Sequence, residues 1–358
     1  MTTAASLASY ASSFPSFRNR IINGDMRIDQ RNAGAISNPT GGTNTYTIDR
    51  WQFSFFNPGS RVTNVQQVSD DVPKGFSYSM KVSCGNNSGT QDANEQLLIQ
   101  QQIEGHNVGD FSWYDNSPSV LTLSFYVKSN LTGSFPLIIK LSSNNSSQNN
   151  TGTRTLPLKY EINTANTWER KSVTFTLDAY SGTRIISNTF AIAVAFYLSA
   201  GSSRRGVAYN VWRGNANQAT SGLDNYTFLD STSNEFFITG VQLEEGTVPT
   251  PFEHRPYGVE LALCQRYYYG HPSYPWARLI APDGNPNDFN GTAAFKVTMR
   301  ATPSTNELIV YEAGSLSDLS GISSLNISNQ SISFIRMGSD GAADRRALDI
   351  TGFVDAEL

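Results

Sequence analysis

The chain has 358 residues, with 26 Lys or Arg against 30 Asp or Glu and a formal net charge of −4. Charged residues make up 16% of the sequence, below the roughly 25% of ordinary soluble proteins. No cluster of basic residues occurs, and duplex binding neutralises several phosphates together, so nucleic-acid binding is not expected. The 20 Phe, 16 Tyr and 5 Trp are sufficient for a core, and the length predicts two compact units.

Membrane insertion and a cysteine-based site are also not expected. The longest apolar runs, such as Phe190–Leu198, are much shorter than the roughly 20 residues that span a bilayer. The first residues lack the basic start and long apolar stretch of a secretory signal. Cys84 and Cys264 are predicted to be two buried thiols, because a zinc site needs about four clustered ligands. No metal or other cofactor is therefore expected.

Residues 1–18 are small and polar, with a rough helical spacing of Leu7, Tyr10, Phe14 and Phe17. Two interpretations stay open for them, a short docking segment and a bare terminal tail.

Residues 19–253 read as a succession of short strands. Large and small, or apolar and polar, residues alternate in several segments, which is the period of a strand with one dry face. Gly, Asn and Ser loops separate these segments, a pattern typical of an antiparallel β-sandwich. The predicted strands are Phe76–Ser83, Val120–Val127, Phe135–Leu141, Glu169–Leu177, Phe190–Leu198 and Phe236–Glu244.

Two polar or proline-rich stretches divide the chain. Ser142–Thr153 is entirely polar and predicts a long hairpin loop between two strands. Thr247–Pro256 contains three prolines, which exclude a central strand and predict a domain boundary. Residues 254–358 are expected to form a small C-terminal β domain with a short helix at Gly258–Tyr267. Its predicted strands are Ala293–Met299, Glu307–Tyr311, Ser331–Arg336 and Arg346–Val354.

Two stretches carry recognisable sequence motifs. The first is Asn19–Arg31 (NRIINGDMRIDQR), followed by Tyr46–Trp51 (YTIDRW); the second is Phe236–Glu253, running into Arg255–Tyr269. Together they resemble a family of phage virion proteins of the tail-fibre, head-fibre or minor structural type. The resemblance implies a virion protein that is assembled in the host cytoplasm and forms a homotrimer bound to other virion proteins.

 The resemblance to this family frames nearly all of the first domain and extends into the second.

The same motifs more distantly resemble those of jelly-roll carbohydrate-binding modules. Asn23-Gly24-Asp25-Met26 and Trp51 fit the opening of such a module, and Gly240-Val241-Gln242-Leu243 fits its closing strand. The first and last strands of a jelly roll pair side by side, so these two segments are expected to be neighbours. The resemblance also implies a structural calcium near this seam. Gly240 stands where the carboxylate ligand belongs, and calcium takes 6–8 oxygen ligands, so no metal site is expected here.

Catalytic patterns are missing from the sequence. His106, His254 and His271 fall in loop-like contexts without a partner motif. Glu244 and Glu245 are neighbours near the end of a strand, where successive side chains point to opposite faces, so they do not converge on one bond. The chain is therefore expected not to be an enzyme.

Carbohydrate binding needs only exposed rings and a few hydrogen-bonding groups. The candidate carbohydrate-binding residues are Trp212, Trp113, Tyr114 and Trp276. The alternative for each is a core or subunit contact, because loop aromatics often fold back. Trp51 and Trp168 adjoin strand signals and are expected in the core.

The sequence thus predicts an all-β protein, a jelly-roll-like antiparallel β-sandwich followed by a smaller C-terminal β domain. Its expected function is that of a fibre-like phage appendage that adheres to host surface polysaccharide. A capsid decoration or head-fibre protein without glycan binding is the alternative.

Overall fold

The computed structural model describes residues 17–39, 44–142, 153–179, 182–214, 219–220, 222–271, 277–280, 288–312, 322–337 and 347–357. The chain divides into two compact units, one ending at Arg255 and the other beginning at Pro256. The expected docking segment lies almost wholly outside the described residues, since only Phe17 and Arg18 of it are described.

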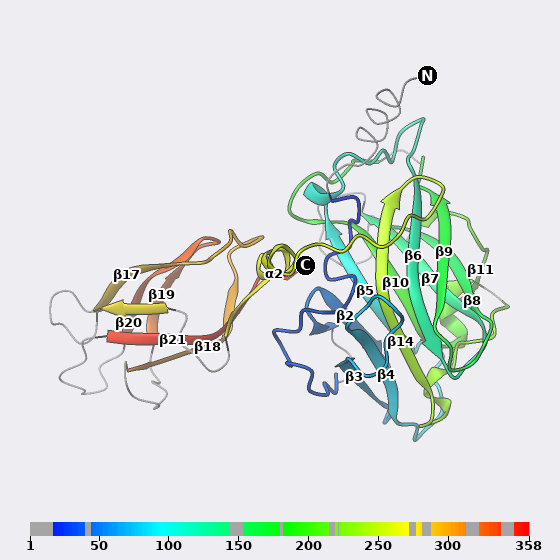
Figure 1. Ribbon diagram of the computed structural model, residues 1–358, viewed down its shortest axis with the longest axis horizontal. Helices are drawn as coiled ribbons and strands as arrows, with labels where there is room; N and C mark the ends of the chain where they lie inside the picture. Colours follow the sequence, from blue (N-terminus) through cyan, green and yellow to red (C-terminus); the bar gives the residue numbers. More distant parts are fainter. Residues whose placement is uncertain are drawn as a thin grey trace. The chain divides into compact units, whose positions relative to one another are not determined.

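The first unit contains two facing antiparallel sheets (Figure 1). The five-stranded sheet has the order β3-β4-β14-β6-β9. Its strands are β3 (Val62–Val68), β4 (Ser79–Asn86), β6 (Val120–Ser129), β9 (Glu169–Thr176) and β14 (Glu235–Glu245).

The seven-stranded sheet has the order β1-β2-β5-β10-β7-β8-β12. Its strands are β1 (Asn44–Ile48), β2 (Trp51–Phe56), β5 (Gln96–Glu104), β7 (Gly133–Ser142), β8 (Thr153–Ile162), β10 (Phe190–Ala200) and β12 (Arg213–Gly214). A small parallel pair, β11 (Arg205–Val207) and β13 (Ala219–Thr220), lies in the connection between β10 and β14.

The strand order is that of a jelly roll. The strands β4 to β10 can be numbered 1 to 7 in chain order, and β14 is then strand 8. One sheet then holds strands 1-8-3-6 and the other holds strands 2-7-4-5, the arrangement that two Greek keys produce. The predicted fold class, an antiparallel jelly-roll-like β-sandwich, is confirmed.

The core fills the space between the two sheets. Phe125 of β6 and Phe196 of β10 come from opposite sheets, and their ring centroids are 4.9 Å apart in an edge-to-face arrangement. Along β14, Phe236, Ile238, Val241 and Leu243 enter this core. Side chains alternate between the two faces on either side of Gly240, so Phe237 and Gln242 face outward.

The two recognisable sequence motifs form the seam that closes the sandwich. The Arg20 N–H donates to the Leu243 carbonyl at 2.9 Å, and the Val241 N–H donates to the Gly24 carbonyl at 2.9 Å. Trp51, fully buried, donates its indole N–H to the Asn23 carbonyl at 2.9 Å. The opening and closing segments are thus adjacent, as expected, and the two motifs form a structural seam.

The described residues of the second unit include one helix, α2 (Tyr257–Gln265), close to the predicted Gly258–Tyr267. Its sheet has the order β15-β21-β16-β17-β20-β19, with β18 also paired to β21. The strands are β15 (Tyr268–His271), β16 (Ala277–Ile280), β17 (Asp288–Ala294), β18 (Ser304–Glu312), β19 (Ile322–Ile327), β20 (Ser331–Met337) and β21 (Ala347–Asp355).

One predicted strand of the second unit is wrong. Ala293–Met299 alternates like a strand, but β17 ends at Ala294. The N–H groups of Phe295 and Met299 donate instead to the carbonyls of Gln330 and Asn329, in the turn before β20. The alternation reflects this packing against a turn, since Phe295 and Met299 are both buried.

Candidate functional site

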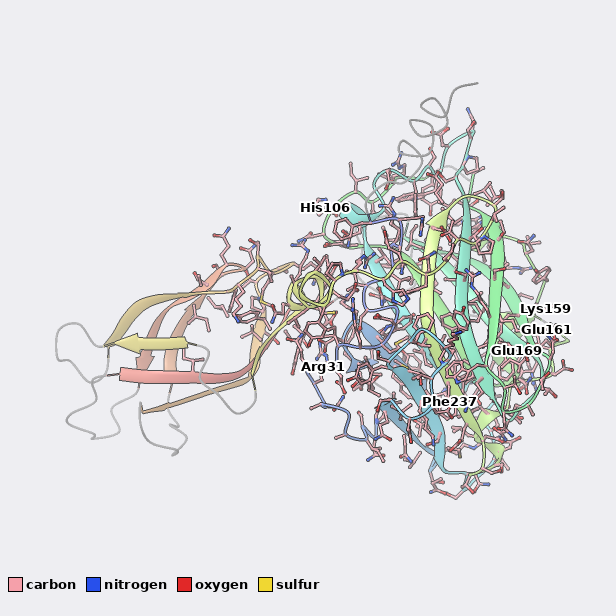
Figure 2. The ribbon with its side chains drawn as sticks, viewed as in Figure 1. Arg31, His106, Lys159, Glu161, Glu169 and Phe237 are labelled. Carbon is pink, nitrogen blue, oxygen red and sulfur yellow. The ribbon has the colours of Figure 1, made fainter. Side chains whose placement is uncertain are left out.

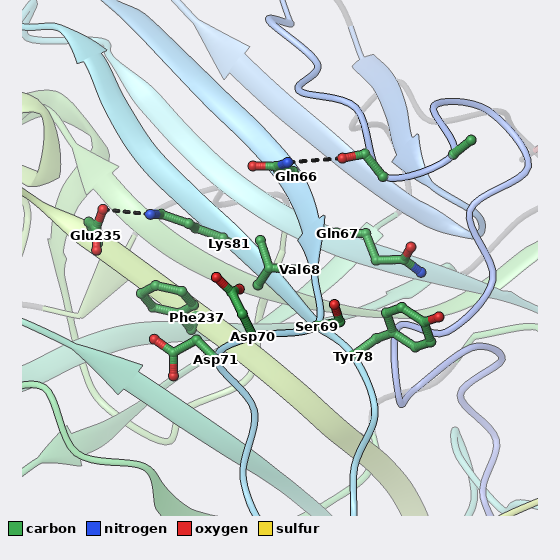
Figure 3. Close-up of a pocket in the computed structure, with 12 residues that line it drawn as sticks. Gln66, Gln67, Val68, Ser69, Asp70, Asp71, Tyr78, Lys81, Glu235 and Phe237 are labelled. Carbon is green, nitrogen blue, oxygen red and sulfur yellow. Dashed lines mark hydrogen bonds and ion pairs between the residues drawn. The ribbon is translucent and has the colours of Figure 1, made fainter.

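A polar groove lies on the outer face of the five-stranded sheet (Figure 3). It has a volume of about 590 Å³, within the range of ordinary ligand sites. Strands β3, β4 and β14 supply its floor, and the loop after β3 supplies one wall. We call it the β3–β14 groove; it is lined by Ala33, Gly34, Gln66, Gln67, Val68, Ser69, Asp70, Asp71, Tyr78, Lys81, Glu235 and Phe237.

The floor of the β3–β14 groove centres on Phe237, an outward residue of β14 (Figures 2 and 3). Two ammonium groups lie over its ring, Lys81 Nζ at 5.4 Å and Lys128 Nζ at 4.3 Å from the centroid. Such cation–π contacts hold lysine stems flat against an aromatic face. Only 4% of Phe237 is exposed, so its ring serves as a foundation and does not offer a free stacking surface.

Both of these lysines are neutralised by carboxylates. Lys81 pairs with Glu235 at 2.7 Å, and Lys128 pairs with Asp71. Trp168 donates its indole N–H to the same Asp71 carboxylate at 3.0 Å. The groove therefore presents no unpaired cation among its described lining residues.

Several acceptors of the groove remain open. The Asp70 carboxylate is exposed and has no partner among the described residues. Gln66 donates its amide N–H to the Gly34 carbonyl at 2.9 Å, and Gln67 donates to Met26 at 2.6 Å. Each glutamine is thereby held in place by its amide nitrogen, which leaves its side-chain oxygen to accept a bond from a ligand.

An aromatic cluster lies on the same face beside the groove. Phe76 packs against Tyr126, Phe252 and His254, with ring centroids 5.2 to 5.4 Å apart. It sits over Gly240, where a Cβ atom would come within 2.6 Å of the Phe76 ring. Because Phe252 comes from the proline-rich segment after β14, this cluster fixes that segment onto the sheet.

Two of the predicted carbohydrate-binding residues have distinct environments. Trp113 is fully buried in the core, with the Arg184 guanidinium 5.0 Å from its ring centroid. This corrects the expectation that Trp113 offers a ring to glycan, because its loop folds back over the end of the sandwich. Tyr114, next to it, is half-buried and also packs against the core, so its role in binding stays a prediction.

Trp212 is half-buried and packs against the core, and its indole N–H donates to the Thr176 carbonyl at 2.9 Å. Its neighbours Tyr209 and Val211 are exposed. Trp276 lies outside the described residues. The predicted residues are therefore not gathered into one site, and glycan contact by Trp212 stays a prediction.

The structure gives no sign of a converging catalytic pair among these carboxylates. Glu244 is buried and accepts bonds from the N–H and hydroxyl of Thr250, whereas Glu245 accepts a bond from the Ser119 hydroxyl. His106 and His254 are exposed. The described residues include no group of three His, Cys, Asp or Glu side chains that could hold a metal ion.

Two further predictions concern single residues. Cys84 and Cys264 are both buried and form no disulfide, as predicted. Trp168 is only half-buried at the edge of the groove, so its expected place in the core is wrong. Trp168 directly precedes β9, and its ring packs on the Phe237 ring, with 6.2 Å between the ring centroids. No helix within the described ranges is long and apolar enough to cross a membrane.

Sequence reasoning missed the β3–β14 groove. Its residues come from three strands and a loop that are far apart in the chain. A signal for Phe237 was present, because it occupies an outward position of a predicted strand between the inward residues Phe236 and Ile238. The pairing of β14 with β4, which brings Phe237 opposite Lys81, is a tertiary fact.

Comparison with known proteins gives structural likeness only. No family model matches the chain, and no curated protein matches it. A putative sugar binding protein from Bacteroides thetaiotaomicron is 13% identical, with a TM-score of 0.38; the match covers 64% of this chain and 100% of that one.

Two other solved structures are similar over a comparable part of the chain. The family 11 carbohydrate-binding module of a Clostridium thermocellum cellulase is 14% identical, with a TM-score of 0.30, covering 62% of this chain and 99% of the module. The enzymatically active domain of tailspike protein 4 from bacteriophage CBA120 is 14% identical, with a TM-score of 0.30, covering 64% of this chain. The match spans 22% of that tailspike chain.

Proposed function

We propose that this chain is a non-enzymatic structural protein of a tailed-phage virion, a fibre-like appendage that adheres to host surface glycan. The β3–β14 groove carries the adhesion part of the proposal. Its volume and its amide, hydroxyl and carboxylate groups suit a saccharide. The resemblance of the two sequence motifs to those of phage virion proteins supports the proposed place in the virion.

The charges of the groove favour a neutral glycan. Lys81 and Lys128 are already paired, and the unpaired group is the Asp70 carboxylate. Sugar hydroxyls donate well to a carboxylate and to the side-chain oxygens of Gln66 and Gln67, whereas an acidic sugar would be repelled by Asp70. A homotrimer bound to other virion proteins would present three such grooves and raise a modest affinity by avidity.

A binding measurement tests the groove. Purified full-length chain is titrated with neutral polysaccharide from host envelopes, and Asp70→Ala and Tyr78→Phe are compared with the native chain. Loss of one hydrogen bond costs about 1 kcal/mol, which weakens binding about fivefold. Tyr209→Phe is the matched control for Tyr78→Phe, since Tyr209 is exposed and lies outside the groove.

Three outcomes contradict the proposal. The groove is not the glycan site if both variants bind as tightly as the native chain. The chain is not a virion protein if antibody finds it absent from purified particles. It is an enzyme after all if incubation with host polysaccharide releases reducing sugar.

A further inference from the structure

A second pocket, of about 470 Å³, lies in the connection between β10 and β14. We call it the Arg205 pocket; it is lined by Ser202, Arg205, Gly206, Gly222, Leu223, Asp224, Tyr226 and Thr227. None of these residues lines the β3–β14 groove. The two cavities are therefore separate sites on one sandwich.

The Arg205 guanidinium lies over the Tyr226 ring, 4.6 Å from its centroid. Within the described part of the chain, no hydrogen bond or ion pair occupies its N–H groups. A guanidinium stacked on a ring keeps its donors in one plane, a geometry that suits bidentate binding of a carboxylate. Arg205 is thus a positioned donor that has no acceptor among the described residues.

The platform beneath Arg205 is fixed from several sides. The Tyr226 hydroxyl accepts a bond from the Leu223 N–H at 3.2 Å. Its backbone carbonyl accepts bonds from the Gln91 amide at 2.7 Å and from the Ala200 N–H at 2.9 Å. Tyr226 is only 6% exposed. The ring that carries the guanidinium is therefore held in place before any ligand arrives, which lowers the entropic cost of binding.

Asp224 supplies the opposite charge in the same pocket. The Ser134 N–H and hydroxyl each donate to its Oδ2 atom at 2.8 Å. These two bonds hold the pKa of the Asp224 carboxyl below its ordinary value, so Asp224 stays ionised at neutral pH. The second carboxylate oxygen remains an acceptor for a hydroxyl group.

The pocket therefore asks for a ligand with two kinds of group. A simple anion would satisfy Arg205 but would give Asp224 no hydroxyl donor. A neutral sugar would satisfy Asp224 but would leave the guanidinium without its charged acceptor. A sugar acid carries a carboxylate and several hydroxyls on one ring, and it matches both residues.

We infer that the Arg205 pocket is a second saccharide site, which binds a carboxylate-bearing sugar through Arg205 and orients its hydroxyls on Asp224. This site is independent of the neutral-glycan groove. One chain then contacts two chemically different parts of an envelope polysaccharide.

Calorimetric titration of the full-length chain tests this inference. The probes are trisaccharides of glucuronate, of galacturonate and of N-acetylneuraminate, each beside its carboxyl-reduced form. At least one acidic probe is expected to bind ten times more tightly than its reduced form. Arg205→Gln is expected to weaken that binding at least tenfold, and Arg205→Lys to weaken it less, because lysine keeps the charge but loses the planar fork.

Two controls separate this site from the groove and from misfolding. Tyr78→Phe in the β3–β14 groove is expected to leave the acidic probe's affinity unchanged. Each variant is used only with a thermal unfolding midpoint equal to that of the native chain. The inference is overturned if no acidic probe binds saturably, if the reduced probes bind equally well, or if folded Arg205→Gln and Arg205→Lys both bind as tightly as the native chain.

Discussion

Single charged residues in apolar surroundings give this protein its sharpest local properties. Arg61 is 6% exposed and Glu95 is fully buried, and they pair at 3.2 Å. Burial raises the pKa of the Glu95 carboxyl, while the Arg61 charge lowers it. Arg61 also pairs with Asp230 at 2.7 Å, which ties the start of β3 to the segment before β14.

Replacing Arg61 is expected to be costly. Arg61→Met leaves the buried Glu95 carboxylate without its cation, and breaking a buried pair typically costs about 3–5 kcal/mol. Chemical denaturation at pH 7 measures the free energy of unfolding. Lys159→Met, which removes an exposed pair with Glu161, is the control and is expected to change it by less than about 1 kcal/mol.

The Lys140 side chain makes the free energy of unfolding depend on pH in the alkaline range. Burial lowers the pKa of its ammonium from 10.5 to about 8. Between these two values the unfolded chain binds more protons than the folded chain, so the free energy of unfolding rises with pH from about 8 to 10.5. Lys140→Met is expected to remove this rise and to be more stable than the native chain at pH 7. Equal pH profiles for the two proteins would contradict the assignment.

At the scale of the element, β14 organises the sandwich. It pairs with β4 on one side and with β6 on the other, and its register with β6 shifts between Thr239 and Gln242. Gly240 occupies this bulge with a φ of +60°, in the left-handed region. The bulge ends the pairing with β4 and lets the opening segment of the chain take over that edge.

Gly240→Ala is expected to destabilise the first unit by about 1–3 kcal/mol, because alanine strains the left-handed backbone and its Cβ meets the Phe76 ring. Gly214→Ala on β12 is the matched control. Its Cβ has no atom within 4 Å and its φ is not in the left-handed region, so little change is expected. Thermal unfolding followed by near-ultraviolet circular dichroism compares the two; equal midpoints would show that the bulge carries no strain.

The predicted strands of the first unit all occur, but some observed strands were not predicted. The alternation in Val120–Val127 and the apolar run Phe190–Leu198 were sufficient to find β6 and β10. Strand β5 escaped because Gln100, Gln101 and Gln102 interrupt its apolar pattern, although all three are buried. Their burial depends on partners from other segments, such as the Ile22 backbone that bonds Gln101.

At the scale of the whole molecule, the first unit is closed by its own two ends. The Glu253 carboxylate accepts bonds from the N–H groups of Arg18 and Asn19, at 3.2 and 2.9 Å. The Arg255 guanidinium donates to the Ile21 carbonyl at 3.1 Å. The proline-rich segment is therefore part of the sandwich, and the boundary between the units follows it.

Truncation tests this closure. A chain ending at Arg255 is expected to fold with a single cooperative transition, whereas a chain ending at Gly246 loses the bonds of Thr250, Glu253 and Arg255 and is expected to be several kcal/mol less stable. Urea unfolding measures both. Equal stability of the two truncated chains would show that the closing segment contributes nothing.

The sequence by itself determined the fold class, most strands of the sandwich and the seam, because alternating side chains and two distinctive motifs are local signals. It did not determine either cavity. Lys81, Lys128 and Phe237 meet only through the pairing of β4, β6 and β14. Trp113 faces the core instead of solvent for the same reason, since burial of a loop aromatic depends on what folds beneath it. Periodicity reports which side of a strand is dry, whereas a binding site depends on which strands lie side by side.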